Sequence, residues 1–401
     1  MDGTEEPVTA APRPLSLAQL PIWRAEVLRR GTPRWTQMTT IRLQGVVDAD
    51  RLERAIGVIV ARHPALRTRL QRRGSKASQI FAPTTGFHLK RHNQTTARPE
   101  QDAVIAKFLS AAQRDKFDLY GGVLFRADLL ALTEEEFVLL LCLHHIAADG
   151  VALGLIVPQI AAAYREEYGE TRPDRAYEDW LDRQRDAPPT GVEAASAYYR
   201  QTLDGAALRS ATIYDEPEDG ELREAPDLLE AGITLDAELS KALRALARER
   251  GGTLFIVLFA AYVAMLRLFA AQSDLVVATF VSGRAGERGP IVGSCINTVL
   301  VRVRLGAGEA AGALIDTVKE AWHPVRRHQA VPSALLSGAD HANLPLAQFA
   351  INFLDMNDAA FDVPGLSSSV THAQQGFPLN DVLLYALREQ DDRLRLRLIA
   401  G

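Results

Sequence analysis

Residues 137–150, FVLLLCLHHIAADG, decide the fold of this chain. The segment 137–143 is a nearly continuous apolar run, which predicts a strand buried on both faces of a sheet. Beyond Gly150, apolar residues return at the spacing of one helix face, at Leu153, Val157, Ile160 and Tyr164. The stretch therefore predicts a buried strand, a short polar loop and a helix, with two histidines where the strand ends.

Strand and helix patterns alternate along the rest of the chain. Residues 39–47 alternate as a strand does, and Asp48 is placed to cap a helix that ends at Pro64. Further strands are predicted at 66–70, 79–82, 124–132, 275–280, 297–305, 346–353, 381–387 and 393–399, and helices at 15–28, 103–114, 237–250 and after Thr253. These patterns predict a mixed α/β fold in two lobes of similar size.

A polar, proline-bearing segment at 169–191 predicts the boundary between the lobes. Residues 1–14 are expected to form a flexible leader, residues 15–190 the first lobe and residues 191–401 the second. The most apolar stretch, 254–266, is broken by Arg267 and is shorter than the roughly 20 apolar residues that cross a bilayer. It predicts a buried helix.

Composition excludes several classes of protein. The 401 residues include 45 basic and 50 acidic side chains, a net charge of -5, which argues against a general nucleic-acid binder. Two cysteines cannot build a disulfide framework for a chain this long, so a reducing compartment fits best. The first 14 residues lack the basic start and apolar stretch of a secretion signal. We expect a cytoplasmic protein with no nucleic-acid or membrane partner.

The histidine pair at the strand end is the sharpest chemical feature. Neighbouring side chains on a strand point to opposite faces, so one of His144 and His145 is expected to face a cleft while the other packs. Imidazole titrates near neutrality and can take a proton from an amine or hydroxyl, or orient it. Asp149 could pair with an arginine, and Gly150 is expected to adopt a positive φ. Two core histidines and a helix-capping aspartate are the plainer alternative.

Other chemistries find little support in the sequence. Adjacent strand residues do not easily ligate one ion, and no third ligand at zinc-like spacing follows, so no metal site is predicted. No G-x-S-x-G, Walker or dinucleotide-binding pattern is present. Cys142 lies in an apolar run that keeps a thiol protonated.

The heptad HHIAADG, residues 144–150, resembles the H-H-x-x-x-D-G signature of nonribosomal peptide synthetase condensation domains, in the chloramphenicol acetyltransferase-like superfamily. Further matches occur in family order: S-x-A-Q-x-x-x-W at 16–23, R-H-x-x-L-R-T at 62–68, F-D-L at 117–119, Y-x-D-[YW] at 177–180, parts of I-G-x-F-x-N-T at Gly293, Asn297 and Thr298, and H-Q-x-x-P at 328–332. The chain departs from the family at Cys295, which replaces an aromatic residue, and in a degraded motif at 377–380. Family members usually continue past residue 401, so the second lobe is expected to be cut short.

The resemblance implies two acetyltransferase-like lobes that form a V with a central tunnel. Family members join an acyl or peptidyl thioester on a donor carrier protein to an amine, sometimes a hydroxyl, on an acceptor carrier. Both substrates arrive on phosphopantetheine arms, and the domain itself binds no cofactor. The resemblance thus implies a monomeric condensation enzyme that forms an amide, or an ester, with two peptidyl carrier proteins as partners.

The resemblance also assigns roles to residues. His145 is expected to face the nucleophile, as general base or as the group that orients it, with His144 as its packing partner. Asp149 is expected to pair with Arg284, and Gly150 completes the signature. Asn297 and Thr298 are expected to line the tunnel and bond the substrate or the oxyanion, or else to stabilise a turn.

Two other functions stay open. One is an acyltransferase of the same superfamily that uses acyl coenzyme A, against which the carrier-type motifs at Tyr177 and His328 argue. The other is a catalytically silent module that recruits an enzyme to a carrier-bound peptide. Such a module is expected to have a damaged signature, whereas residues 144–150 are intact.

Overall fold

The computed structural model places two compact units. It describes residues 12–28, 35–74, 76–83, 86–167, 173–186, 190–207, 229–284, 289–306, 308, 310–336, 347–355, 360–373, 380–388 and 393–400. The first unit comprises residues 1–188, 286–295 and 358–376, and the second comprises 189–285, 296–357 and 377–401. Most of the expected leader and of the degraded motif at 377–380 lies outside the described residues.

A five-stranded sheet forms the centre of the first unit. Its order is β12-β2-β7-β6-β5, and the strands are β2 (Thr36–Gln44), β5 (Lys90–Asn93), β6 (Phe125–Ala131), β7 (Glu136–His144) and β12 (Ser367–Ala373). The pairs β12–β2, β2–β7 and β6–β7 are antiparallel, and β5–β6 is parallel. The middle strand, β7, is buried from residue 138 to residue 144, so the prediction of a fully buried strand is confirmed.

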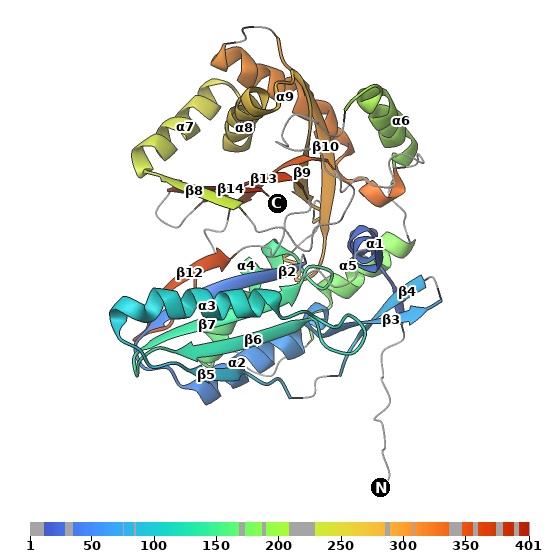
Figure 1. The fold of residues 1–401 in the computed structure, drawn as a ribbon. Coiled ribbons are helices and arrows are strands. Elements are labelled where there is room, and N and C mark those ends of the chain that lie inside the picture. Colours follow the sequence, from blue (N-terminus) through green and yellow to red (C-terminus); the bar gives the residue numbers. More distant parts are fainter. Residues whose placement is uncertain are drawn as a thin grey trace, which may run out of the picture. The chain divides into compact units, whose positions relative to one another are not determined.

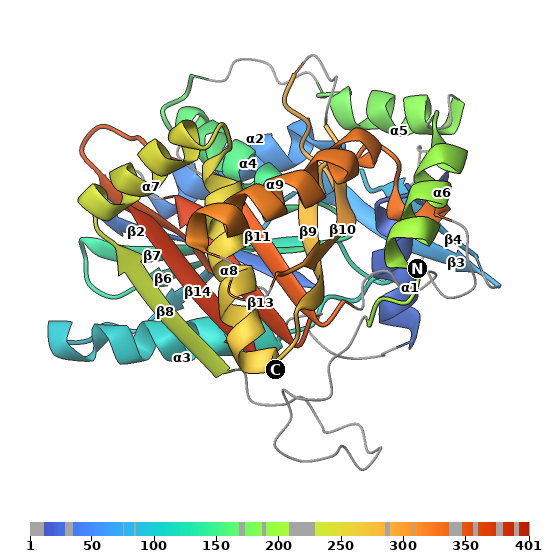
Figure 2. The ribbon, with the colours of Figure 1, turned by 90° about the horizontal axis from the view of Figure 1, so that it is seen from above.

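Helices cover both faces of this sheet. α2 (Ala49–Arg62) and α4 (Gly150–Tyr164) pack on one face, and α3 (Gln101–Arg114) packs on the other (Figure 2). The start of α2 follows its sequence, because the Asp48 side chain accepts hydrogen bonds from the backbone N–H groups of Asp50 and Arg51. The helix ends at Arg62, just before Pro64, as predicted, and a 3₁₀ turn begins at Pro64.

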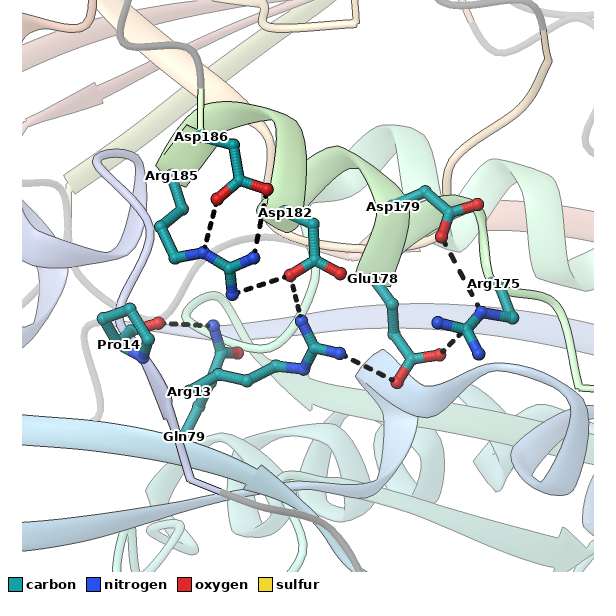
Figure 3. Close-up of polar contacts among 9 residues, drawn as sticks. All are labelled: Arg13, Pro14, Gln79, Arg175, Glu178, Asp179, Asp182, Arg185 and Asp186. Atoms are coloured by element: carbon teal, nitrogen blue, oxygen red, sulfur yellow. Dashed lines mark hydrogen bonds and ion pairs between the residues drawn. The ribbon is translucent and has the colours of Figure 1, made fainter.

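A smaller sheet ties the N-terminal part of the first unit in place (Figure 1). It has the order β1-β4-β3, with β1 (Arg13–Pro14), β3 (Thr68–Arg73) and β4 (Lys76–Phe81), and lies near α1 (Gln19–Leu28) and α5 (Ala176–Asp186). Arg13 forms ion pairs with Asp182 at 2.5 Å and Glu178 at 3.8 Å on α5, and Gln79 donates to the Pro14 carbonyl (Figure 3). The chain that enters α1 is therefore held by both β4 and α5.

The second unit is built on a six-stranded sheet of order β10-β9-β11-β13-β14-β8. Its strands are β8 (Leu229–Leu235), β9 (Asp274–Ser282), β10 (Ile296–Arg304), β11 (Phe349–Asp355), β13 (Val382–Arg388) and β14 (Leu394–Ala400). α7 (Ala237–Glu249), α8 (Leu254–Ala270) and α9 (Ala311–His328) cover one face (Figure 1). The apolar cluster on the opposite face includes α6 (Val192–Leu203).

The apolar stretch after Thr253 forms α8, which lies in the core of the second unit, so the prediction of a buried helix is confirmed. Within the described part of the chain, no single helix is long and apolar enough to cross a membrane. α7 and α8 meet that length and composition only when taken together, and the chain bends by 102° between them.

Candidate active site

The candidate site lies at the junction of β7 and α4 in the first unit. β7 ends at His144, residues 145–147 form a turn, and Asp149 caps α4. The expectation of a positive φ at Gly150 is wrong, because that residue is the first of α4 and does not have a positive φ. The chain turns earlier, at residues 145–147, so that His145 itself begins the turn.

His144 has partners on both ring nitrogens. Its Nδ1 accepts a hydrogen bond from the Ile146 N–H at 3.2 Å, and its Nε2 lies 3.5 Å from Oε1 of Glu26 on α1. The ring also meets Phe117 edge-on, with 6.2 Å between centroids. With only 5% of its surface exposed, His144 is packed and locally bonded.

His145 is buried as well, but its ring is less engaged. Its backbone N–H donates to the Trp35 carbonyl at 2.7 Å, and the two rings meet edge-on at 5.9 Å. The buried Nδ1 has no hydrogen-bond partner in any other described residue. Burial lowers the pKa of His145 below 6.5, although the Asp149 charge opposes this effect. The imidazole is therefore neutral at pH 7 and able to accept a proton.

Asp149 joins two segments that are distant in sequence. Its Oδ1 accepts from the Ala152 N–H at 3.1 Å, which caps α4, and its Oδ2 accepts from the Cys295 N–H at 3.0 Å. Its own N–H donates to the Gly293 carbonyl at 3.3 Å. The segment 293–295 is thus fastened to the signature loop, while the pairing of Asp149 with Arg284 stays a prediction.

Several of the family-like motifs pack together beside this loop. An apolar cluster combines residues of the motifs at 62–68, 177–180 and 293–298 with their neighbours: Ala65, Phe81, Tyr177, Trp180, Leu181, Ile291 and Cys295. The rings of Tyr177 and Trp180 stack at 5.8 Å. Cys295, where the family has an aromatic residue, is fully enclosed in the cluster. The motifs therefore build the support of the signature loop.

Substituting Gly293 by alanine is expected to destabilise the first unit, because a Cβ at this position would overlap the Tyr177 ring. Tyr177 is stacked on Trp180 and only 2% exposed, so it has little room to move. Overpacking of this kind costs about 1–3 kcal/mol of unfolding free energy. Denaturant unfolding of the wild type and of Gly293→Ala, followed by a spectroscopic probe in the first unit, measures this loss of unfolding free energy.

Gly289→Ala is the matched control, because a Cβ at Gly289 meets nothing within 4 Å. Equal stability of the two variants would contradict the packing argument.

Gln19, in the first motif, reaches the signature loop directly. Its Nε2 donates to the Ile146 carbonyl at 2.8 Å and to Oε1 of Gln79 at 3.0 Å. Its Oε1 accepts from the Ser16 N–H, and its own N–H donates to the Ser16 hydroxyl. The sequence places Gln19 in a family-like motif but does not predict its contact with Ile146. The only signal for this contact is the presence of a glutamine within that motif.

Asn297 and Thr298 lie on β10 in the second unit. The Asn297 amide donates to the carbonyls of Gln329 and Val331 at 3.0 and 2.9 Å, and its oxygen accepts from the Ser333 N–H. Both amide protons are therefore used in holding the segment of the H-Q-x-x-P motif. These bonds support the structural alternative for Asn297 over contact with an oxyanion.

Residues of the motif at 62–68 serve local structure. The Arg67 guanidinium donates to the carbonyls of Val60, Ala61 and Ala82, so it covers the C-terminal end of α2. His63 lies 2.7 Å from Oε1 of Gln159 on α4, and burial lowers its pKa. This motif links α2 to α4 beside the signature loop.

Both cysteines are buried thiols. Burial raises the pKa of Cys142 to about 12, so its thiol is protonated at neutral pH. This agrees with the interpretation of Cys142 as a core residue rather than a nucleophile.

Comparison with known proteins agrees with this architecture. The family model described as "Condensation domain" matches residues 11–395. One protein of the linear gramicidin synthase of Brevibacillus parabrevis is 32% identical over 339 residues, which are 82% of this chain and 4% of that protein. The probable non-canonical nonribosomal peptide synthetase CymA of Salinispora arenicola is 30% identical over 401 residues, 94% of this chain and 5% of that protein.

Solved structures show the same fold. The condensation domain of the monacolin K polyketide synthase MokA has a TM-score of 0.80 at 18% identity, over 98% of this chain and 92% of that one. SgcC5 of Streptomyces globisporus has a TM-score of 0.78 at 20% identity, over 96% and 92%.

The chain belongs to the condensation domain family of nonribosomal peptide synthetases. Enzymes of this family are acyltransferases that form peptide bonds. The resemblance stated from the motifs and the mixed α/β fold class are both confirmed. The chain spans only about a twentieth of the length of these synthetases, 4% of the gramicidin synthase protein and 5% of CymA. The V-shaped arrangement and the tunnel stay predictions.

Proposed function

We propose that this chain joins a carrier-bound acyl or peptidyl thioester to an amine on a second carrier protein, with His145 as the residue that faces the nucleophile. The observation that carries the proposal is the state of His145: a buried, neutral imidazole on a turn fixed from several sides, whose Nδ1 has no hydrogen-bond partner in any other described residue. In its neighbour His144, Nδ1 accepts from the Ile146 N–H, and Nε2 lies 3.5 Å from Oε1 of Glu26.

The chemistry requires little more than positioning and one proton transfer. The acceptor nitrogen attacks the thioester carbonyl carbon, and the C–S bond breaks as the tetrahedral intermediate collapses. The nitrogen loses one proton and the departing thiolate gains one, so the reaction is balanced without a further reactant. A neutral imidazole accepts that proton, or orients a neutral amine for attack. A hydroxyl acceptor would depend more strongly on proton removal, which gives an ester.

Carrier proteins are the proposed partners, and their phosphopantetheine arms would present both substrates. The support is the family relationship together with the carrier-type motifs. The Tyr177 motif packs against the segment bonded to Asp149, and the H-Q-x-x-P segment is held by Asn297. A cytoplasmic location stays a prediction.

With a hydroxyl acceptor, which does not itself titrate in this range, the transfer rate is expected to stay constant from about pH 8 down to pH 6.5 and to fall only at lower pH. The active form of His145 is neutral, and burial lowers its pKa below 6.5, so protonation begins only in more acidic solution. Single-turnover rates measured against pH test this, with intact carriers recovered at each pH as the control. An apparent pKa above 6.5 that disappears in His145→Ala would contradict the expected direction.

A two-carrier transfer assay followed by intact-protein mass spectrometry tests the proposed function. Acyl thioesters are loaded on one carrier, and amine or hydroxyl acceptors on the other. Acyl transfer that His145→Ala abolishes supports condensation catalysis and identifies the class of nucleophile. Product only from acyl coenzyme A would favour the soluble-donor alternative, and carrier binding without product would favour the recruitment alternative.

A further inference from the structure

Helix α1 contacts the histidine turn at two points. Gln19 and Glu26 are seven residues apart, which is two helical turns, so they lie on the same face of α1. Gln19 donates to the Ile146 carbonyl, and Glu26 lies beside the His144 ring. The two contacts fall on either side of His145.

The contact of Glu26 fixes the proton of His144. Because His144 Nδ1 accepts the Ile146 N–H, the neutral ring must carry its proton on Nε2. That nitrogen lies 3.5 Å from Oε1 of Glu26, and the two side chains are only 6% and 15% exposed. A carboxylate at this point favours the Nε2–H form, and this form leaves Nδ1 free to accept.

The contact of Gln19 fixes the carbonyl of the same residue, Ile146. Both of its amide protons are used, at 2.8 Å to the Ile146 carbonyl and at 3.0 Å to Gln79, and its oxygen accepts from Ser16. The side chain is fully buried. Ile146 is thus held at its N–H by His144 and at its carbonyl by Gln19, and its peptide neighbour is His145.

We propose that α1 positions the active-site turn: Glu26 keeps His144 in the Nε2–H tautomer, and Gln19 anchors Ile146, so that His145 is presented in one orientation. Glu26 and Gln19 act as positioning residues, because both act on His145 through other groups. The catalytic part of this inference rests on the proposed function, whereas the tautomer of His144 does not.

The variants Glu26→Ala, Glu26→Gln and Gln19→Met test the inference. Arg24→Gln is the matched control, because Arg24 is exposed on the same helix. ¹⁵N-histidine NMR of the full chain reports the tautomers of the nine histidines, with His144→Ala and His145→Ala used for assignment. We expect His144 to show a protonated Nε2 and an unprotonated Nδ1 in the wild type and in Arg24→Gln, and a mixture of tautomers in Glu26→Ala.

The transfer assay supplies the second readout. Glu26→Ala and Gln19→Met are expected to lower kcat by about 10- to 100-fold with KM nearly unchanged, since a small displacement of a reacting group costs this much. Glu26→Gln keeps an acceptor oxygen and is expected to recover much of the rate. Thermal unfolding checks that each variant is folded, and Glu26→Ala alone carries the test if Gln19→Met does not fold.

The outcomes separate the inference from the proposed function. If the wild type makes no product with any donor or acceptor, the proposed function fails, and the NMR spectra still decide the tautomer. If the wild type makes product while Glu26→Ala retains both its rate and its His144 spectrum, the inference is overturned. A changed spectrum with an unchanged rate would also overturn it.

Discussion

Replacing His145 by alanine is expected to slow acyl transfer by about 10²–10⁴-fold, the usual contribution of a positioned acid or base. His145 is neutral, and its Nδ1 has no hydrogen-bond partner in another described residue, whereas His144 accepts from the Ile146 N–H and has its Nε2 3.5 Å from Oε1 of Glu26. Loss of the imidazole removes the group that accepts the proton or orients the nucleophile. Single-turnover transfer between two carriers, followed by mass spectrometry, measures the loss.

The control for this experiment is His88→Ala, because the His88 side chain is 82% exposed and lies outside the signature loop. It is expected to retain the wild-type rate. The unfolding transition of His145→Ala should stay cooperative, because its backbone bond to Trp35 does not involve the side chain. A transfer rate of His145→Ala within threefold of the wild-type rate would show that His145 is not needed for the reaction. Catalysis would then depend on substrate positioning by other residues.

Replacing Asp149 by alanine is expected to lower the unfolding free energy of the first unit by about 3–5 kcal/mol. The carboxylate is 1% exposed and accepts two backbone hydrogen bonds, and a bond to a charged group contributes about 1.5–3 kcal/mol. Truncation also leaves the Cys295 N–H without its acceptor. Hydrogen exchange of α4 and of the segment 289–295, read by mass spectrometry, measures the loss locally.

Two further variants divide this effect into its parts. Asp149→Asn retains an oxygen for the α4 cap but turns an amide donor toward the Cys295 N–H, so exchange should rise mainly in the segment 289–295. Asp236→Ala removes an exposed cap of α7 that, among the described residues, accepts from the Leu239 N–H alone, and it should cost about 0.5–2 kcal/mol. If Asp149→Ala costs no more than Asp236→Ala, the bond to Cys295 contributes nothing.

The parts of the fold that the sequence predicted well are those with a strong local pattern. The apolar run of β7 and the capped, periodic α2 each carry their signal within about a dozen residues, and Asp48 caps α2 as expected. The intact heptad lies after a buried strand and before a helix, as expected, while the catalytic role of its residues stays a prediction. These features depend on residues that are close in sequence, and a local sequence pattern reports on such residues.

The parts that the sequence missed depend on distant partners. β12, SSSVTHA, has no apolar run, and it becomes a strand because it pairs with β2, where Thr371 lies opposite Thr40. β8 is an almost wholly exposed edge strand defined by its pairing with β14. The contact of Glu26 with His144 joins a helix and a strand end far apart in sequence, and nothing in either segment alone indicates it.

The two late segments that complete the first unit determine when that unit can form during synthesis. Cys295, in the first late segment, supplies an N–H that Asp149 accepts, and Ser367–Ala373, in the second, form strand β12 beside β2. At about 5–20 residues per second, roughly ten to forty seconds separate the synthesis of residue 188 from that of residue 376. β2 is an open edge during that interval, and the signature loop lacks its fastening until Cys295 has been made, so the nascent first unit depends on the second half of the chain to finish its own core.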